Sequence, residues 1–220
     1  MFPIDIPADT TVESLFTEVY PALHRKLVSA SGGGGGGGGG RATSDALTSV
    51  IRLEGGGPSY TIVVRGNDIE VSEGEAKGAP LWVTIRRDVV ERFLADWMGP
   101  KKYVPKTPLP DGVVLLSDPR VMRRLAMVSA RVELALTDFE GERVSLTAGC
   151  GDVAKKGIDP EDPDVVIEAT MDTLTRLVGG QLSPEAALVD GHVAQTGKRF
   201  VAMQLALALA AFYPAPSRRA

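Results

Sequence analysis

The segment that decides the fold is residues 165–213, VVIEATMDTLTRLVGGQLSPEAALVDGHVAQTGKRFVAMQLALALAAFY. It begins with a β-branched run, Val165 to Ala169, which predicts a strand. A short helix is predicted from Met171 to Val178, and a second strand from His192 to Thr196 after the Asp190-Gly191 turn. The segment closes on an almost uniformly apolar helix from about Lys198 to Tyr213. Strands and helices in this order predict an α+β fold.

The first half of the chain contains the same order of signals. The predicted strands there are residues 50–54, 60–66, 68–72, 81–85 and 113–116, and the predicted helices are residues 88–98 and 119–128, with Asp118 as an N-cap. In the second half, a hairpin of residues 132–136 and 144–149 precedes the segment quoted above. Asp111-Gly112 precedes a strand and a final helix, as Asp190-Gly191 does later. This recurrence predicts two tandem copies of one small domain.

Nine consecutive glycines, Gly32 to Gly40, separate a leading amphipathic helix from the rest of the chain. Glycine loses the most backbone entropy on folding and has no side chain to bury, so this run predicts a flexible surface linker. We therefore predict an N-terminal amphipathic helix in residues 1–30, a poly-glycine linker in residues 31–41, and repeats in residues 42–128 and 129–220. The helix is expected to pack on the first repeat.

Residues 131–213 resemble the sterol carrier protein-2 (SCP2) family. That family typically shows a Gly-Lys-Leu-x-Pro-like turn after a short helix, then Gly-x-Leu-x-Ile-x-Gly-Asp before a long apolar helix. The residues that fall on this pattern are Gly180, Leu182, Pro184, Ala186, Gly191, Val193 and Gly197. Gln195 stands where an apolar residue is usual, and Lys198 stands where aspartate is usual. In the first half the pattern is fainter, because Asp118 replaces the second glycine.

The resemblance implies two tandem SCP2-like domains. Each would be a mixed five-stranded sheet covered on one face by helices, with an apolar tunnel between sheet and helices. Because side chains alternate across a strand, apolar residues two apart on the predicted strands are expected to face the same side. The ligand-binding residues that we expect are Leu134, Leu146, Ile167, Leu177, Phe200, Met203, Leu207 and Phe212.

The closing helix is apolar almost all round, whereas a helix with one solvent face shows a polar stripe. It is therefore expected to be buried on two sides. Two arrangements satisfy this expectation. The helix packs between two layers of protein or at an oligomer interface, or it packs on the sheet and lines a ligand cavity.

Composition argues against several classes of function. The net charge of -4 gives no long-range attraction to phosphate backbones, so no nucleic-acid partner is expected. The single cysteine, Cys150, cannot form an internal disulfide and fits a reducing, cytoplasmic location. The first residues lack the basic region and long apolar run of a signal peptide, so export is not expected. The longest apolar run, residues 200–213, is too short to span a bilayer, so no transmembrane segment is expected.

Catalytic and metal-binding patterns are not found in the sequence. His24 and His192 lie far apart, with no cysteine or carboxylate at ligand spacing. No serine lies in a Gly-x-Ser-x-Gly elbow, and Cys150 has no base that can be inferred. We therefore expect no catalytic residue, no metal and no cofactor, and thus no enzyme.

The function that the resemblance implies is non-catalytic binding or transfer of a hydrophobic ligand in an apolar tunnel. A fatty acyl chain, a sterol-like lipid and a quinone are the ligand classes considered. The alternative is a structural or protein-interaction module whose own side chains fill the cavity, with a protein partner or a second copy of the chain.

Overall fold

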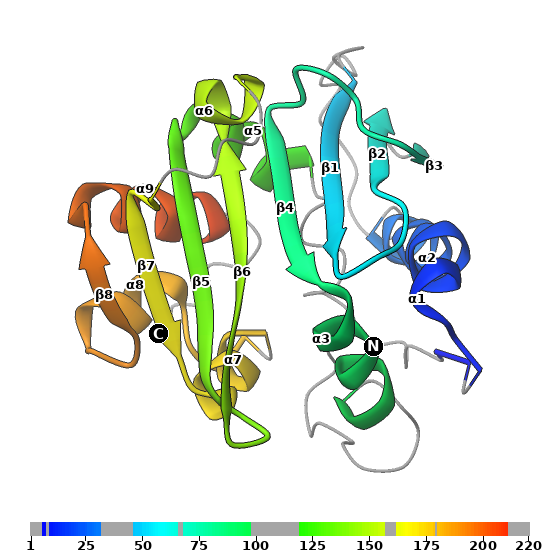
Figure 1. Ribbon diagram of the computed structural model, residues 1–220. Coiled ribbons are helices and arrows are strands. Elements are labelled where there is room, and N and C mark those ends of the chain that lie inside the picture. The colour runs from blue at the N-terminus through cyan, green and yellow to red at the C-terminus, as the bar shows by residue number, and fades with distance from the viewer. Residues whose placement is uncertain are drawn as a thin grey trace.

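Eight strands pair side by side into one mixed sheet (Figure 1). The computed structural model describes residues 6–7, 9–31, 46–65, 68–97, 119–156, 162–178 and 180–210. The strands are β1 (Leu47–Glu54), β2 (Tyr60–Arg65), β3 (Asp68–Glu73), β4 (Leu81–Arg86), β5 (Ala130–Phe139), β6 (Glu142–Cys150), β7 (Val165–Ala169) and β8 (Ala194–Gly197). Their order across the sheet is β3-β2-β1-β4-β6-β5-β7-β8.

Each half of the chain contributes four of these strands. β1 and β2 are antiparallel and β4 lies parallel to β1, while β5 and β6 are antiparallel and β7 lies parallel to β5. The expectation of two separate five-stranded sheets is therefore not confirmed. The two half-sheets join because β4 and β6 pair antiparallel, so neither strand is left as an open edge. The strand expected at residues 113–116 lies outside the described residues.

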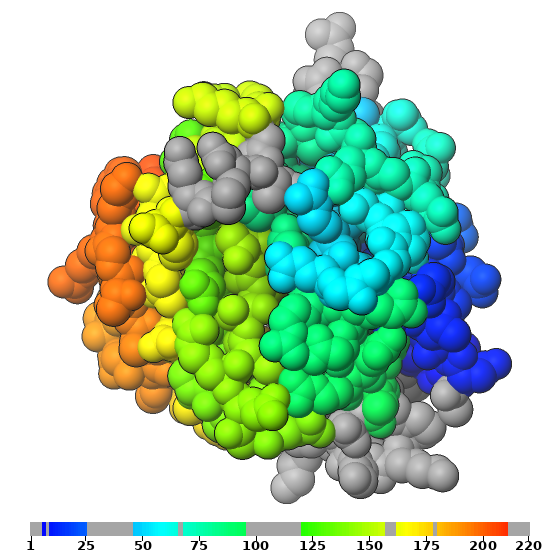
Figure 2. Space-filling model, viewed as in Figure 1, coloured from blue at the N-terminus to red at the C-terminus, as the bar shows by residue number. Residues whose placement is uncertain are grey.

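The seam between the halves is closely packed. Viewed from the face of the sheet opposite the long helices, the two halves form one surface, and the β5–β6 turn lies against the segment after β4 (Figure 2). At the seam Trp82 of β4 pairs with Gly149 of β6, and Trp82 is 4% exposed. A Cβ atom at position 149 would overlap the Trp82 indole ring, so only glycine fits there.

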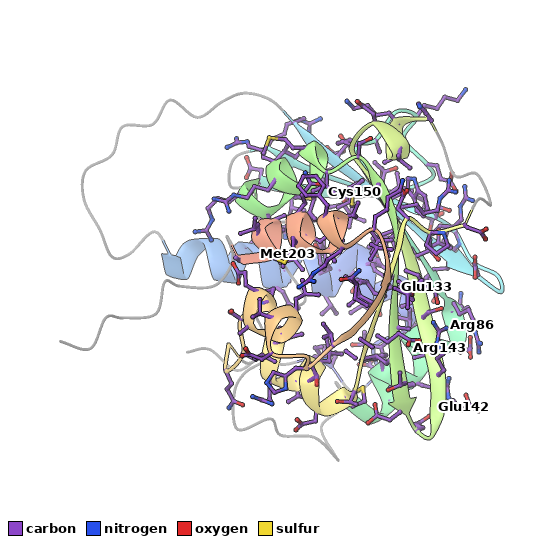
Figure 3. All side chains as sticks on the ribbon, turned by 90° about the vertical axis from the view of Figure 1, so that its left-hand side faces the viewer. Arg86, Glu133, Glu142, Arg143, Cys150 and Met203 are labelled. Carbon is purple, nitrogen blue, oxygen red and sulfur yellow. The ribbon has the colours of Figure 1, made fainter. Side chains whose placement is uncertain are left out.

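The helices are α1 (Val12–Ser14), η1 (Leu15–Val19), α2 (Tyr20–Ser31), α3 (Arg87–Arg92), η2 (Phe93–Trp97), α5 (Pro119–Met127), α6 (Gly151–Lys155), α7 (Met171–Val178), α8 (Pro184–Val189) and α9 (Arg199–Ala210). One face of the sheet is covered by helices, whereas α6 packs through Ala154 against Trp82 on the other face. The segments η1 and η2 are π-helical. Figure 3 shows the sheet from its edge, with α2, α5 and α9 on one side and the labelled side chains of Arg86 and Arg143 on the other.

The leading helix packs on the first half of the sheet, as predicted. Thr11 caps it by accepting a hydrogen bond from the Ser14 amide. Phe16 stacks on Tyr60 of β2 with ring centroids 4.9 Å apart. The cluster that joins the helix to the sheet consists of Val12, Leu15, Phe16, Tyr20, Ile51, Leu53, Tyr60, Ile62, Val64, Ile69 and Val90. The poly-glycine run lies outside the described residues.

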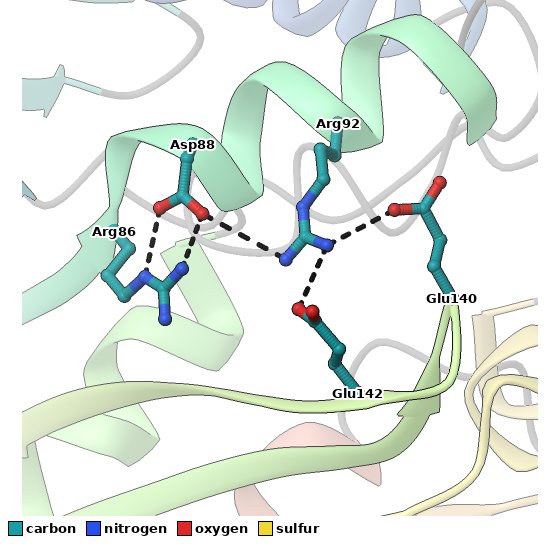
Figure 4. A network of polar contacts seen from close by, with 5 residues as sticks. All are labelled: Arg86, Asp88, Arg92, Glu140 and Glu142. Carbon is teal, nitrogen blue, oxygen red and sulfur yellow. Dashed lines mark hydrogen bonds and ion pairs between the residues drawn. The ribbon is translucent and has the colours of Figure 1, made fainter.

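A second contact joins the halves at the turn of the β5–β6 hairpin. Arg92 of α3 pairs with Glu140 and Glu142, each at 3.2 Å (Figure 4). Its guanidinium lies 5.1 Å from the centre of the Phe139 ring. Phe139 also stacks on Phe93, with ring centroids 4.7 Å apart. This contact fixes the hairpin turn against α3.

Candidate functional site

Four apolar side chains lie next to one another across four neighbouring strands. Ile85 of β4 pairs with Leu146 of β6, Leu146 pairs with Leu134 of β5, and Leu134 pairs with Ile167 of β7. Paired residues point to the same face of a sheet. We call these four residues the apolar row. At its end, Ile167 pairs with Gln195 of β8.

The apolar row is only partly covered, although it lies on the face that the helices cover. Leu134 is 39% exposed on a central strand, and Ile85, Leu146 and Ile167 are half-buried. The next row along the same strands is closed. Its members are Val83, Ala148, Val132 and Val165, each at most 8% exposed. A change from buried to exposed over one pleat means that the helices stop short of the apolar row.

Two core clusters account for this gap in the cover. Helices α5 and α9 pack on the closed row through Val121, Leu125, Val201 and Leu205. On the other side, Phe139, Val144 and Val89 form a separate cluster that also touches Met171 of α7. The apolar row lies between the two clusters, and neither buries it fully.

The structure brings three of the predicted ligand-binding residues together. Leu134, Leu146 and Ile167 are direct cross-strand neighbours. Leu177 of α7 and Met203 of α9 are half-buried, and Figure 3 shows Met203 on the side of α9 toward α8.

The remaining predicted residues do not join this group. Phe200 and Leu207 are 73% and 53% exposed, on the side of α9 opposite its buried residues. Phe212 lies outside the described residues. The sequence prediction did not include Ile85, although strand alternation had placed it on the same face as Val83.

Two concave pockets lie elsewhere on the described surface. One, of about 320 Å³, lies on the opposite face of the sheet and is lined by Trp82 together with Arg52, Lys77 and Lys155. The other, of about 410 Å³, lies between the N-terminal segment and α3. Neither includes a residue of the apolar row. Charged side chains in both make them poor environments for an apolar chain, because a charge taken out of water must be compensated.

The polar residues that were considered for chemistry have other environments. Cys150 is 2% exposed, and burial raises the pKa of its thiol to about 12, so the thiol is neutral at physiological pH. His192 is exposed and His24 is buried in α2. Among the residues that the structure describes, no three His, Cys, Asp or Glu side chains are grouped as metal ligands. Within the same residues, no helix has the length and apolar character needed to cross a membrane.

Asp164 fixes the start of β7 and the junction of β8 with α9. Its carboxylate accepts hydrogen bonds from the Arg131 amide at 2.8 Å and from Lys198 Nζ at 2.6 Å. Its backbone carbonyl accepts from the Lys198 amide. The Lys198 hydrogen bond, together with the Arg131 amide, lowers the pKa of Asp164 from its ordinary value of 3.8. The residue that departs from the family pattern, Lys198, therefore has a structural partner.

We expect Asp164→Asn to lower the free energy of unfolding by about 1 kcal/mol at neutral pH, because the charged hydrogen bond to Lys198 is lost. A carboxyl whose pKa is lowered in the folded state stabilises above its ordinary pKa, and this contribution disappears as the pH falls below 3.8. Urea unfolding of both proteins at neutral and acidic pH measures the difference. A difference that stays constant down to the most acidic pH would contradict this assignment.

Comparison with known proteins gives a family match over less than half of the chain. Residues 113–210 match the model of the SCP-2 sterol transfer family, which confirms the resemblance found in the sequence. The match does not reach residues 42–112, so the duplication stays a prediction. No curated protein matches the chain.

Several solved structures are similar to the chain. Apo sterol carrier protein 2 from Yarrowia lipolytica is 19% identical, over 44% of this chain and 82% of its own, with a TM-score of 0.32. The sterol carrier protein domain 2 of Helicoverpa armigera is 18% identical, over 45% and 79%, with a TM-score of 0.35. Sterol carrier protein 2 like 2 from Aedes aegypti is 11% identical, over 86% and 94%, with a TM-score of 0.20.

Proposed function

We propose that the apolar row binds the hydrophobic tail of a small ligand, which the protein carries or transfers without changing it. The observation that supports this proposal is the partial exposure of four aligned apolar side chains between two closed core clusters. A helix-covered sheet face normally buries such residues, and an apolar surface left open is typical of a binding site. The family match agrees with a hydrophobic ligand.

The dimensions of the row suit an extended hydrocarbon chain. Neighbouring strands lie about 4.8 Å apart, so four strands span about 14 Å. An extended chain of about a dozen carbons has this length. Each methylene group that leaves water on binding contributes about 0.8 kcal/mol. Because the four side chains of the row are apolar, selectivity would rest on length and shape, and a fatty acyl chain, a sterol-like lipid and a quinone all fit this description.

We also propose that the two halves descend from one duplicated domain, with boundaries at residues 42–128 and 129–220. The shared order of a hairpin followed by a strand parallel to its first member supports this proposal. In this account the duplication produced one sheet, because β4 and β6 pair with each other. The ligand site then consists mainly of residues from the second half, and the first half contributes Ile85. A cytoplasmic location and the absence of catalysis are parts of the same proposal.

The experiment that tests the ligand proposal is a titration of the full chain with a fluorescent fatty acid. We expect saturable binding to the parent protein. Leu134→Gln should weaken it about tenfold or more, because a polar side chain replaces the most exposed part of the apolar surface. Leu134 is already 39% exposed, so this variant is expected to fold.

The matched control is Glu133→Gln, which introduces the same side chain one residue earlier on the same strand. Glu133 points to the opposite face, where it pairs with Arg143 at 2.7 Å. Binding by this variant should equal that of the parent. Equal affinities for Leu134→Gln and Glu133→Gln would exclude the apolar row as the site. Absence of saturable binding in the parent, across fatty acids, sterols and quinones, would favour the protein-interaction module instead.

A further inference from the structure

The two ends of the apolar row differ in polarity. At the β4 end, Ile85 pairs with Leu53 of β1, which is 6% exposed and belongs to the cluster that joins the leading helix to the sheet. At the other end, Ile167 pairs with Gln195 of β8, the strand at the edge of the sheet. Because paired residues point to the same face, Gln195 extends the row by one strand spacing, about 4.8 Å. One end of the row is therefore closed by an apolar side chain, and the other end has a side-chain amide.

The amide of Gln195 keeps an acceptor atom available. The side chain is half-buried, and its Nε2 donates a hydrogen bond to the Gly197 carbonyl at 3.4 Å. A carbonyl can only accept, so this contact turns the donor side of the amide toward Gly197. Within the part of the chain that the structure describes, no hydrogen bond to Oε1 is formed. The Oε1 atom can therefore accept a hydrogen bond from a bound molecule.

A ligand with its tail on the apolar row has its head group at one of these two ends. At the Leu53 end a polar head would lie against a buried apolar side chain, where its loss of water is not compensated. At the Gln195 end a hydroxyl group can donate its proton to Oε1. A quinone oxygen and an ionised carboxylate have no proton to donate, so both match Oε1 less well than a hydroxyl does.

We propose that Gln195 is a specificity-determining residue, which accepts a hydrogen bond from the hydroxyl head group of a lipid alcohol. This inference rests on the proposed function, because it requires the tail to lie on the apolar row. The hydroxyl lies at β8, and the tail runs across β7, β5 and β6 toward β4. The apolar row then selects by length and shape, and Gln195 adds selection by head group.

The test compares dodecanol with its methyl ether as competitors of the fluorescent fatty acid on the full chain. The ether lacks the hydroxyl proton and has one more methyl group, so purely hydrophobic binding would favour the ether. We expect the parent protein to bind the alcohol more tightly than the ether. In Gln195→Leu the ratio of the two affinities should fall about three- to tenfold, as expected for the loss of one hydrogen bond. This variant should still bind the ether, because its apolar row is intact.

The matched control is Gln204→Leu, the same substitution on α9. Gln204 is half-buried and lies on the side of the helix that carries the exposed Phe200 and Leu207, since residues three and four apart share a helix face. This variant should keep the ratio of the parent. An equal fall in both variants, or an unchanged ratio in Gln195→Leu, would overturn the assignment to Gln195.

Two outcomes separate this inference from the proposed function. Equal affinities of the parent for the alcohol and the ether would overturn the inference, while saturable fatty-acid binding that Leu134→Gln weakens would still support the apolar row. Absence of saturable binding in the parent would overturn both.

The direction of the ligand has its own measurement. With dodecanol bound, NMR should show contacts from the protons next to its hydroxyl to the side-chain amide of Gln195. Its terminal methyl group should contact Ile85. The reverse orientation would overturn the inference.

Discussion

Replacing Gly149 with alanine is expected to lower the free energy of unfolding by about 3 kcal/mol, because the new methyl group would overlap the Trp82 indole ring. Trp82 is 4% exposed and lies on the neighbouring strand of the seam. To avoid the methyl group, the indole ring must shift toward the pocket that it lines, or β4 and β6 must separate locally, and either change disturbs the packing of the seam. Urea unfolding measures the change.

A second substitution tests the cause of this loss. In a Trp82→Leu background the ring is absent, and Gly149→Ala should then cost about 1 kcal/mol or less. The two substitutions are thus expected to couple by about 2 kcal/mol. An equal loss of unfolding free energy in both backgrounds would show that the methyl group destabilises strand β6 itself. The contact with Trp82 across the seam would then not be the cause.

Phe139→Ala is expected to cost about 3 to 4 kcal/mol, because the ring is a buried anchor of the β5–β6 turn. Phe139 is 3% exposed, stacks on Phe93 and lies beneath the Arg92 guanidinium. Its removal leaves a cavity and takes away a contact that joins the halves at the β5–β6 turn. Thermal and urea unfolding of the variant measure this loss.

The matched control is Phe200→Ala, the same substitution on the exposed side of α9. Phe200 is 73% exposed, so little contact is lost and the free energy of unfolding should change by about 0.5 kcal/mol or less. Similar losses at both positions would contradict the burial that distinguishes them, and with it the placement of the hairpin turn on α3.

Local sequence patterns predicted most of the elements. The β-branched runs gave the strands β1 to β8 to within a few residues, and Pro119 begins α5 as expected. The short helices α6 and α8 were not predicted. They contain five and six residues, which is too short for a hydrophobic period to show.

Pairing between the halves could not be predicted from the sequence. An edge strand presents the same backbone N–H and C=O groups to any partner strand. The sequence of β4 therefore does not predict that β4 pairs with β6. Gly149 is required at this contact because a side chain there would overlap the Trp82 ring. This requirement can be recognised only when the structure shows that Trp82 lies opposite Gly149. For this reason the expected pair of five-stranded sheets was not confirmed.

The site was predicted in part for a related reason. Alternation along the strands placed Leu134, Leu146 and Ile167 on one face, and their registers put them next to one another. Ile85 completes the row only because the halves join. On α9 the sequence is apolar on every side, so no polar stripe indicated which side packs inward, and Phe200 and Leu207 were assigned to the tunnel.

The central claim is that a hydrophobic ligand lies along the apolar row. The most direct measurement is an NMR experiment on the full chain with labelled methyl groups and a bound isotope-labelled fatty acid. We expect intermolecular contacts from the acyl chain to the methyl groups of Ile85, Leu134, Leu146 and Ile167. Contacts confined to residues of other elements, with the four methyl-bearing side chains unaffected by the ligand, would contradict the account.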